Sequence, residues 1–179
     1  MASGIPPLPP GVFSITAFRL IDAPIDDVWR ILLDFPAYSE WNPFVRGQAI
    51  VDKNKITVDD QTPRVGQYIS MEPVHIPPTM GEPGWFGKSS TMVQISTLDH
   101  ENHRAAWITV GFPNFLLRAE RWQVLSVDTS GKTKYETAEV FSGILTWFIY
   151  FFVHANLKLG FSAHADGLKN RAERLHKTT

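Results

Sequence analysis

Two carboxylates and an arginine occur on neighbouring stretches of the chain that alternate apolar and polar residues. The stretch 116–127 contains Glu120, the stretch 134–141 contains Glu139, and the turn sequence DTSGK separates them. Side chains two residues apart share one face of a β-strand, and strands joined by a short turn pair antiparallel. If Trp122 and Phe141 point inward, the interior face of this strand pair also carries four polar side chains: Arg118, Glu120, Tyr135 and Glu139.

Two carboxylates in apolar surroundings are able to perform acid–base chemistry. Burial raises a carboxyl pKa, so one group can donate a proton while the other accepts one. Such a pair suits proton transfer at a carbonyl or enol. Two alternatives stay open: Arg118 neutralises Glu120 as a structural ion pair, or a one-residue error in the face assignment places Arg121 and Glu136 inside instead.

Two histidines fall on the apolar stripe of a helical pattern near the C-terminus. The stripe consists of residues spaced three, four and seven apart: Leu157, Phe161, Leu168, Ala172 and Leu175. Neutral imidazole is an effective base near pH 7. His154 is therefore a candidate catalytic residue beside Glu120 and Glu139, and His164 a candidate ligand contact. The alternative for each is a partly exposed helix histidine without a catalytic role.

Composition and motifs argue against metals, cofactors and nucleic acid. The chain has no cysteine, and His100 and His103 lie in a polar turn without further ligands at zinc spacing. Glycine-rich phosphate loops and the serine elbow of hydrolases are absent. A net charge of −1 offers no basic excess for phosphates. We therefore expect no metal, no cofactor and no nucleic-acid partner.

The N-terminal segment and the longest apolar run bear on location. Residues 1–12 hold four prolines and predict an extended arm that precedes a single domain, 13–179. The arm has no basic region of the kind that begins a signal peptide. The apolar run 144–153 has ten residues, whereas a bilayer span needs about 20. The expectation is a cytoplasmic protein without stable membrane insertion.

The order of predicted elements indicates an α+β fold. Turn sequences divide the chain into a strand, two short helices, six further strands and one long helix. The expected strands are 13–20, 44–52, 66–72, 90–98, 105–111, 116–127 and 134–141, and the last helix begins between 146 and 153. A sheet with one apolar face must be covered, and only the last helix is large enough. A curved antiparallel sheet around that helix leaves room for a ligand between them.

Aromatic and apolar side chains supply the expected lining of that space. The predicted ligand-binding residues are Arg118, Trp122, Tyr135, Phe141, Trp107, Trp85, Phe86, Leu157, Phe161 and His164. Trp85 and Phe86 stand in a long connection rich in proline and glycine, which favours a hydrophobic lid. The aromatic run 147–152 has two open roles, packing under the rim of the sheet or touching a membrane surface.

Four segments of the chain form a recognisable combination. The opening DAPIDDVW at 22–29 and DFPAYSEWNPF at 34–44 are the most specific part of it. The segment EVFSG at 139–143 and a tail with Gly160-Phe161, Leu168-Lys169 and Arg171-Ala172-Glu173 add to it. Together these segments resemble the SRPBCC proteins, the helix-grip superfamily of START lipid-transfer domains, polyketide cyclases and the birch-pollen allergen. The likeness extends over about residues 13–176 and is to the polyketide cyclase/dehydrase branch.

The resemblance implies a helix-grip fold and leaves three functions open, because this scaffold hosts carriers, sensors and enzymes alike. The first is binding of a hydrophobic, lipid-like or polyketide-like molecule in the internal cavity. The second is a cyclase, dehydratase or isomerase that acts on a polyketide-like intermediate by acid–base catalysis without a cofactor. The third is an interaction module like the Hsp90 cochaperones of the superfamily.

Overall fold

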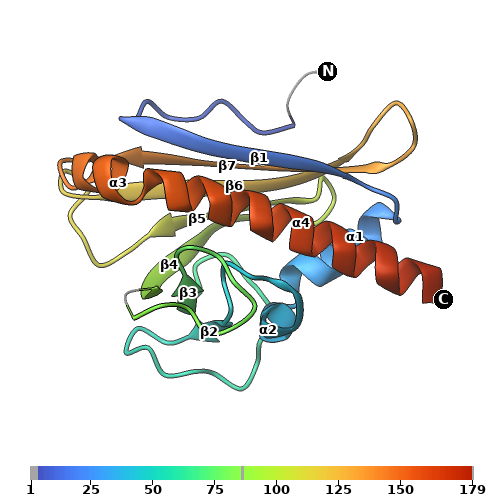
Figure 1. The fold of residues 1–179 in the computed structure, drawn as a ribbon, viewed down its shortest axis with the longest axis horizontal. Helices are drawn as coiled ribbons and strands as arrows, with labels where there is room; N and C mark the ends of the chain where they lie inside the picture. Colours follow the sequence, from blue (N-terminus) through green and yellow to red (C-terminus); the bar gives the residue numbers. More distant parts are fainter. Residues whose placement is uncertain (1–3, 86, 179) are drawn as a thin grey trace.

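One antiparallel sheet organises the protein. The computed structural model describes residues 4–85 and 87–178. The strands of the sheet are β1 (Phe13–Ile21), β2 (Gln48–Val51), β3 (Tyr68–His75), β4 (Lys88–Asp99), β5 (Arg104–Thr109), β6 (Arg118–Val127) and β7 (Thr133–Ser142). They are hydrogen-bonded in the order β1-β7-β6-β5-β4-β3-β2. Strands β2 to β7 therefore form a meander, and β1 pairs with the last strand of it (Figure 1).

The helices occupy two places in the chain. Helix α1 (Ile25–Leu33), the 3-10 turn η1 (Phe35–Ala37) and α2 (Tyr38–Trp41) follow β1, whereas α3 (Thr146–Phe152) and α4 (His154–Thr178) follow β7. Asp26 and Asp27 occupy the first turn of α1, where the helix dipole favours negative charge. Helix α4 crosses one face of the sheet (Figure 1). The expected α+β helix-grip architecture is confirmed, with the predicted last helix divided in two at Val153.

Polar contacts tie α4 to the edge strand β1. The guanidinium of Arg19 donates through Nε to Asp166 Oδ1 over 2.6 Å and through a terminal nitrogen to Asp166 Oδ2 over 2.9 Å. The same terminal nitrogen lies 2.7 Å from Ser162 Oγ. Such a two-point arginine–carboxylate contact fixes orientation as well as distance. It therefore sets how α4 lies across the concave face.

The predicted apolar stripe of α4 faces the sheet except at its last member. Phe161, Leu168 and Ala172 are buried, as expected. Leu175 is 42% exposed, because residues 174–178 of α4 extend past the core. The close approach of α4 to Phe44, in the segment after α2, depends on Gly160, where a Cβ would lie only 2.5 Å from the Phe44 ring.

The structure corrects the predicted inward face of β6. Ala119, Arg121 and Leu125 are buried toward α4, so Arg118, Glu120 and Trp122 face the outer side. The misleading residue is Val124. It is buried, but on the outer side, where a Cβ at Gly4 of the N-terminal segment would lie 3.0 Å from its Cγ1 atom. The backbone N–H of Gly4 also donates to Glu136 Oε2 on that side, over 3.0 Å.

The inward face of β7 is as predicted. Tyr135, Thr137, Glu139 and Phe141 are directly opposite the inward residues of β6, in antiparallel register. Opposed residues of an antiparallel pair share one face of the sheet. Of the two carboxylates that the sequence placed inside, the sheet therefore brings only Glu139 to the concave face.

Candidate functional site

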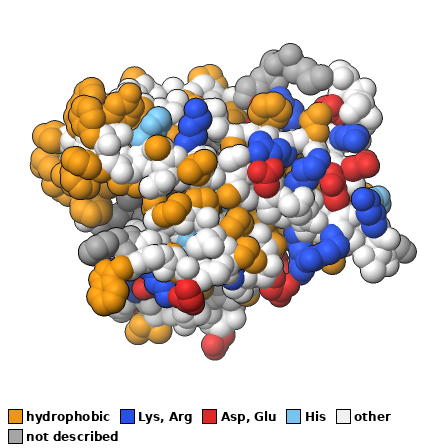
Figure 2. Space-filling model, in the orientation of Figure 1, with side chains coloured by type: hydrophobic (Ala, Val, Ile, Leu, Met, Phe, Trp, Pro, Cys, Tyr) orange, Lys and Arg blue, Asp and Glu red, His pale blue; other side chains and the backbone are white. Residues whose placement is uncertain are grey.

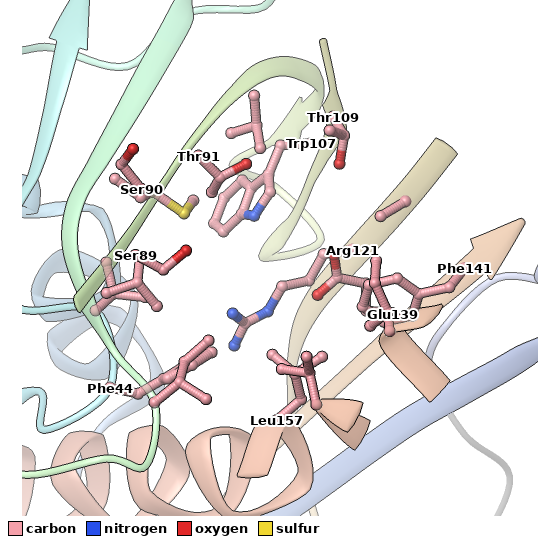
Figure 3. Close-up of a pocket in the computed structure, with 18 of the residues that line it drawn as sticks. Phe44, Ser89, Ser90, Thr91, Trp107, Thr109, Arg121, Glu139, Phe141 and Leu157 are labelled. Atoms are coloured by element: carbon pink, nitrogen blue, oxygen red, sulfur yellow. The ribbon is translucent and has the colours of Figure 1, made fainter. Parts of the chain in front are cut away.

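A cavity of about 330 Å³ lies between the concave face of the sheet and the helices α3 and α4 (Figure 3). Its volume falls in the range that proteins use for small-molecule ligands. Its apolar lining comes from the sheet, from the segment after α2 and from both C-terminal helices, and includes Phe44, Val45, Met71, Val74, Val93, Phe141, Ile149, Val153, Leu157 and Phe161. The cavity is thus apolar over most of its wall.

Three polar side chains project into the cavity from adjacent strands. Trp107 on β5 is directly opposite Arg121 on β6, and Arg121 is directly opposite Glu139 on β7. Directly opposed residues have Cβ atoms about 5 Å apart. Figure 3 shows the guanidinium of Arg121 reaching into the space below the indole of Trp107. We call these three residues the polar row.

Arg121 is a buried cation that forms no ion pair with another described residue. Arg121 is only 4% exposed to solvent. Its Nε donates to Thr137 Oγ1 over 3.2 Å, and its Cζ lies 4.2 Å from the centre of the Phe161 ring. One terminal nitrogen has no hydrogen-bond partner, and no carboxylate within the described ranges forms an ion pair with it. Burying a charge is costly unless an opposite charge or acceptor compensates it, so this guanidinium favours an acceptor from outside the chain.

Glu139 is the titratable acid of the cavity. Burial raises the pKa of its carboxyl from 4.5 to about 7, and the positive charge of Arg121 limits the rise. No hydrogen bond to its carboxylate occurs among the residues that the structure describes. A carboxyl of this kind exchanges its proton near neutral pH, which is the requirement for a general acid or base.

Trp107 and a group of hydroxyls complete the polar lining. The indole Nε1 of Trp107 is buried and unpartnered within residues 4–85 and 87–178. Its N–H is a donor only, so it adds a second donor to that of Arg121. The hydroxyl side chains Ser89, Ser90 and Thr91 of β4 line the opposite part of the cavity, and Thr109 of β5 lies near Trp107 (Figure 3). Ser89 and Thr91 are exposed, which places the mouth of the cavity at the beginning of β4.

His164 lies behind the cavity in a separate polar cluster. The Oδ1 of Asn42 accepts hydrogen bonds from the backbone N–H groups of Phe44 and Val45, at 3.0 and 3.1 Å. The amide nitrogen of Asn42 therefore donates to His164 Nδ1, over 2.8 Å, and the proton of the imidazole resides on Nε2. Burial lowers the pKa of His164 well below 6.5. Because its basic nitrogen is already engaged, His164 is poorly placed to act as a base.

Five of the predicted site residues line the cavity. They are Glu139, Phe141, Trp107, Leu157 and Phe161. Tyr135 is buried on the same face, but its hydroxyl donates to Gln123 Oε1 over 2.5 Å and its ring stacks on His164, away from the cavity wall.

Other predicted residues lie elsewhere. Arg118, Glu120 and Trp122 form their own contacts on the outer face, where Glu120 accepts from Arg118 at 2.7 Å and from the Trp122 indole at 3.0 Å. The prediction that these three residues line the cavity is wrong. Side chains of β6 alternate between the two faces of the sheet, and the prediction assigned the inward face to the wrong set of alternate residues. The open alternative of a structural Arg118–Glu120 pair agrees with this contact.

The remaining predictions concern the ends of the cavity. His154 packs against Phe13 and Tyr150, and it is outside the cavity wall. Trp85 is 95% exposed and does not cover the mouth. Phe86 lies outside the described residues. The central cation, Arg121, enters the sequence prediction only through the alternative of a shifted strand face. Its signal in the sequence is the alternation Ala119, Arg121, Gln123, which the apolar Val124 obscures.

In the part of the chain that the structure describes, no group of three or more histidine, aspartate or glutamate side chains is arranged to hold a metal ion. No helix of that part of the chain has the length and apolar character needed to cross a membrane.

The sequence matches one family model over almost its whole length. Residues 12–173 match the family described as polyketide cyclase / dehydrase and lipid transport. No curated protein shows a significant match to the chain.

Solved structures share the fold at low sequence identity. A hypothetical protein from Helicobacter pylori superimposes with a TM-score of 0.70 at 12% identity, covering 96% of this chain and 99% of its own. The Zhui aromatase/cyclase from Streptomyces sp. R1128 gives a TM-score of 0.68 at 13% identity, with 90% and 94% covered. A START superfamily protein from Mycobacterium smegmatis gives 0.56 at 13% identity, with 90% and 98% covered. At such identities the likeness shows a common fold and nothing finer.

Proposed function

Because the chain belongs to the polyketide cyclase / dehydrase and lipid transport family, we propose that it binds a mostly apolar small molecule in the cavity. The ligand carries one acidic or strongly accepting oxygen, which sits against the polar row. The apolar walls receive the rest of the molecule. No part of this proposal requires a metal or a cofactor.

The observation that carries the proposal is the buried guanidinium of Arg121. It faces an apolar cavity with an unpartnered nitrogen and without an ion pair in the described part of the chain. A ligand oxygen would supply the missing acceptor, and hydrogen bonds to charged groups contribute about 1.5–3 kcal/mol. The N–H of Trp107 stands next to it as a second donor.

The protonated form of Glu139 supports the same ligand class. With a pKa of about 7, roughly half of this carboxyl is neutral at neutral pH. Neutral Glu139 donates a hydrogen bond and does not repel an anion. Binding of an acidic ligand should therefore strengthen as the pH falls from 8 toward 6.

A matched pair of probes tests the proposal. Decanoate and decanol share a ten-carbon chain and differ in the anionic head group, and isothermal titration calorimetry measures both. We expect the wild type to prefer decanoate. Arg121→Met should weaken decanoate binding roughly 10- to 100-fold and leave decanol within about twofold.

Arg118→Met is the control, because it removes an arginine from the outer face of the same strand. It should change neither affinity. Equal binding of decanoate by Arg121→Met and the wild type would show that Arg121 does not hold the acidic group.

A second candidate function is proton transfer at a bound ketone, and Glu139 favours it. A carboxylate with a pKa near 7 is strong enough to remove a proton α to a carbonyl and to return it at another atom. In that step the C–H bond breaks, its proton moves to Glu139, and the electron pair moves onto the carbonyl oxygen. Arg121 and Trp107 are the available donors for the resulting enolate oxygen.

Hydrogen exchange tests this second function without knowledge of the natural substrate. In deuterated water, proton NMR follows loss of the α-hydrogens of a long-chain methyl ketone such as undecanone. Catalysed exchange should vanish in Glu139→Gln and persist in the outer-face control Glu120→Gln. Exchange that survives Glu139→Gln would assign the base to another residue.

A further inference from the structure

A patch of exposed apolar side chains covers α3 and its neighbourhood. We call it the α3 patch and define it as Phe115, Ile144, Trp147, Phe148, Phe151 and Phe152. Phe151 and Phe152 are each 71% exposed. Figure 2 shows hydrophobic side chains gathered at the end of the molecule where Figure 1 places α3. Contiguous exposed apolar surface of this kind marks an interaction site.

Charge is absent from the segments that form this end. Residues 110–117 and 143–157 contain no Asp, Glu, Lys or Arg. They are joined by backbone hydrogen bonds from Ile144 to Phe115 and from Leu145 to Leu116. The first charged residue after each segment is basic, Arg118 and Lys158. Lys158 is exposed and forms no ion pair within the described ranges.

One side of helix α3 lines the cavity, and the other side is exposed to solvent. Ile149 and Val153 line the cavity, and Phe112 of the β5–β6 connection lines it beside them. Trp147, Phe148 and the two following phenylalanines of the patch face outward. An apolar ligand that leaves past α3 would therefore meet apolar surface and not water.

The chemistry of the patch fits a lipid bilayer. Tryptophan and tyrosine are favoured at the membrane interface, where an apolar ring and a polar tip are both satisfied, and α3 contains Trp147 and Tyr150. Its seven residues are too few to span a bilayer, which needs about 20. A short apolar helix followed by an exposed basic residue, here Lys158, binds in the plane of an anionic surface, where the basic side chain adds attraction.

We propose that α3 is a peripheral membrane anchor that inserts the α3 patch into the interface of an anionic bilayer, with the cavity wall formed by Ile149 and Val153 directly behind it. The basic side chain of Lys158 then lies at the level of the phosphate groups. The anchor gives an apolar ligand a path between cavity and membrane. The proposal goes beyond ligand binding itself and does not depend on which ligand the cavity holds.

Vesicle flotation tests the anchor. The probe is the full chain with vesicles of phosphatidylcholine containing about 30% phosphatidylglycerol, compared with vesicles of phosphatidylcholine alone. We expect the wild type to float with the anionic vesicles. The double variant Phe151→Ser/Phe152→Ser should lose roughly tenfold or more in partitioning. Lys158→Gln should weaken binding to the anionic vesicles and not to the neutral ones.

Phe18→Ser is the matched control, because Phe18 is an aromatic side chain of β1 that is 60% exposed outside the patch. It should float like the wild type. Unchanged decanoate affinity in the double variant would show that the fold and the cavity remain intact, so failure of the anchor and failure of ligand binding are separable.

Two results would overturn the proposal. In the first, the wild type stays unbound to anionic vesicles, or the double variant floats equally well. In the second, light scattering shows a dimer that the double variant abolishes while vesicles recruit neither protein, which would make the patch a contact between two copies of this chain.

Discussion

Replacing the cavity carboxyl of Glu139 by its neutral isostere, glutamine, should make the protein more stable than the wild type, by a margin that grows as the pH rises. In the folded state the pKa of Glu139 is about 7, above the ordinary 4.5 of the unfolded chain. Between these values the folded protein holds a proton that the unfolded protein has lost. Stability therefore falls with rising pH through this window. Glu139→Gln removes this ionisation and with it the loss of stability at rising pH.

The size of the effect follows from the two pKa values. Linkage gives a destabilisation by Glu139 of about 1 kcal/mol at pH 5, about 2 kcal/mol at pH 6 and about 3 kcal/mol at pH 8. The difference in unfolding free energy between Glu139→Gln and the wild type should therefore grow by roughly 2–3 kcal/mol from pH 5 to pH 8.

Urea unfolding followed by tryptophan fluorescence measures this difference, since the chain has six tryptophans. The comparison must be made between variants and not from the wild-type slope alone. His164 contributes the opposite sign, because its pKa is lowered on folding and stability is lost as pH falls through 6.5. Carboxylates with lowered pKa values, such as Asp60, change the free energy of unfolding only at still lower pH. Subtraction removes both contributions.

Glu120→Gln supplies the matched control, because it makes the same chemical change on the outer face of the adjacent strand. It leaves Glu139 in place, so it should retain the wild-type decline between pH 6 and pH 8. A constant difference between Glu139→Gln and the wild type across this range would refute the argument that burial in the cavity raises the pKa of Glu139.

Three further outcomes follow from the packing of α4. Gly160→Ala should destabilise by about 1–3 kcal/mol in urea unfolding despite the better helix propensity of alanine, because its Cβ would meet the ring of Phe44 at 2.5 Å. Long-range nitrogen–proton NMR should show His164 neutral from pH 5 to pH 8 with the proton on Nε2, because Nδ1 accepts from Asn42. Leu168→Ala should cost about 2–5 kcal/mol, since Leu168 is fully buried between helix and sheet.

Each of these three outcomes has an internal comparison. Gly81→Ala should be nearly neutral, because its Cβ would meet only Thr79 at an ordinary 3.7 Å. A stabilising Gly160→Ala would contradict the close approach of α4. Asn42→Ala should release Nδ1 of the imidazole and change the tautomer. Leu159→Ala, at an exposed position of the same helix, should cost far less than Leu168→Ala.

The order and type of the elements, and much of the core, follow from local patterns of residues along the chain. Strand periodicity and turn residues placed the strands of the meander to within a few residues, and the helical spacing of Phe161, Leu168 and Ala172 identified the face of α4 that packs on the sheet. Local patterns suffice here because burial on one side imposes a period of two on a strand and about 3.6 on a helix. The same alternation placed Glu139 on the concave face.

The inner face of β6 and the surroundings of the aromatic run 147–152 depend on contacts between segments that are distant in the chain. Val124 is buried on the outer side, where Gly4 of the N-terminal segment lies against it, and no local period distinguishes burial under such a segment from burial under a helix. Gly4 and Val124 are more than 100 residues apart in the chain, so the inner position of Arg121 in place of Glu120 cannot be read from the alternation of β6 alone. The exposure of Phe151 and Phe152 likewise depends on where the end of the sheet leaves α3 uncovered. An apolar residue indicates that a position is removed from water. Whether a helix, another segment or a partner covers that position depends on the three-dimensional arrangement.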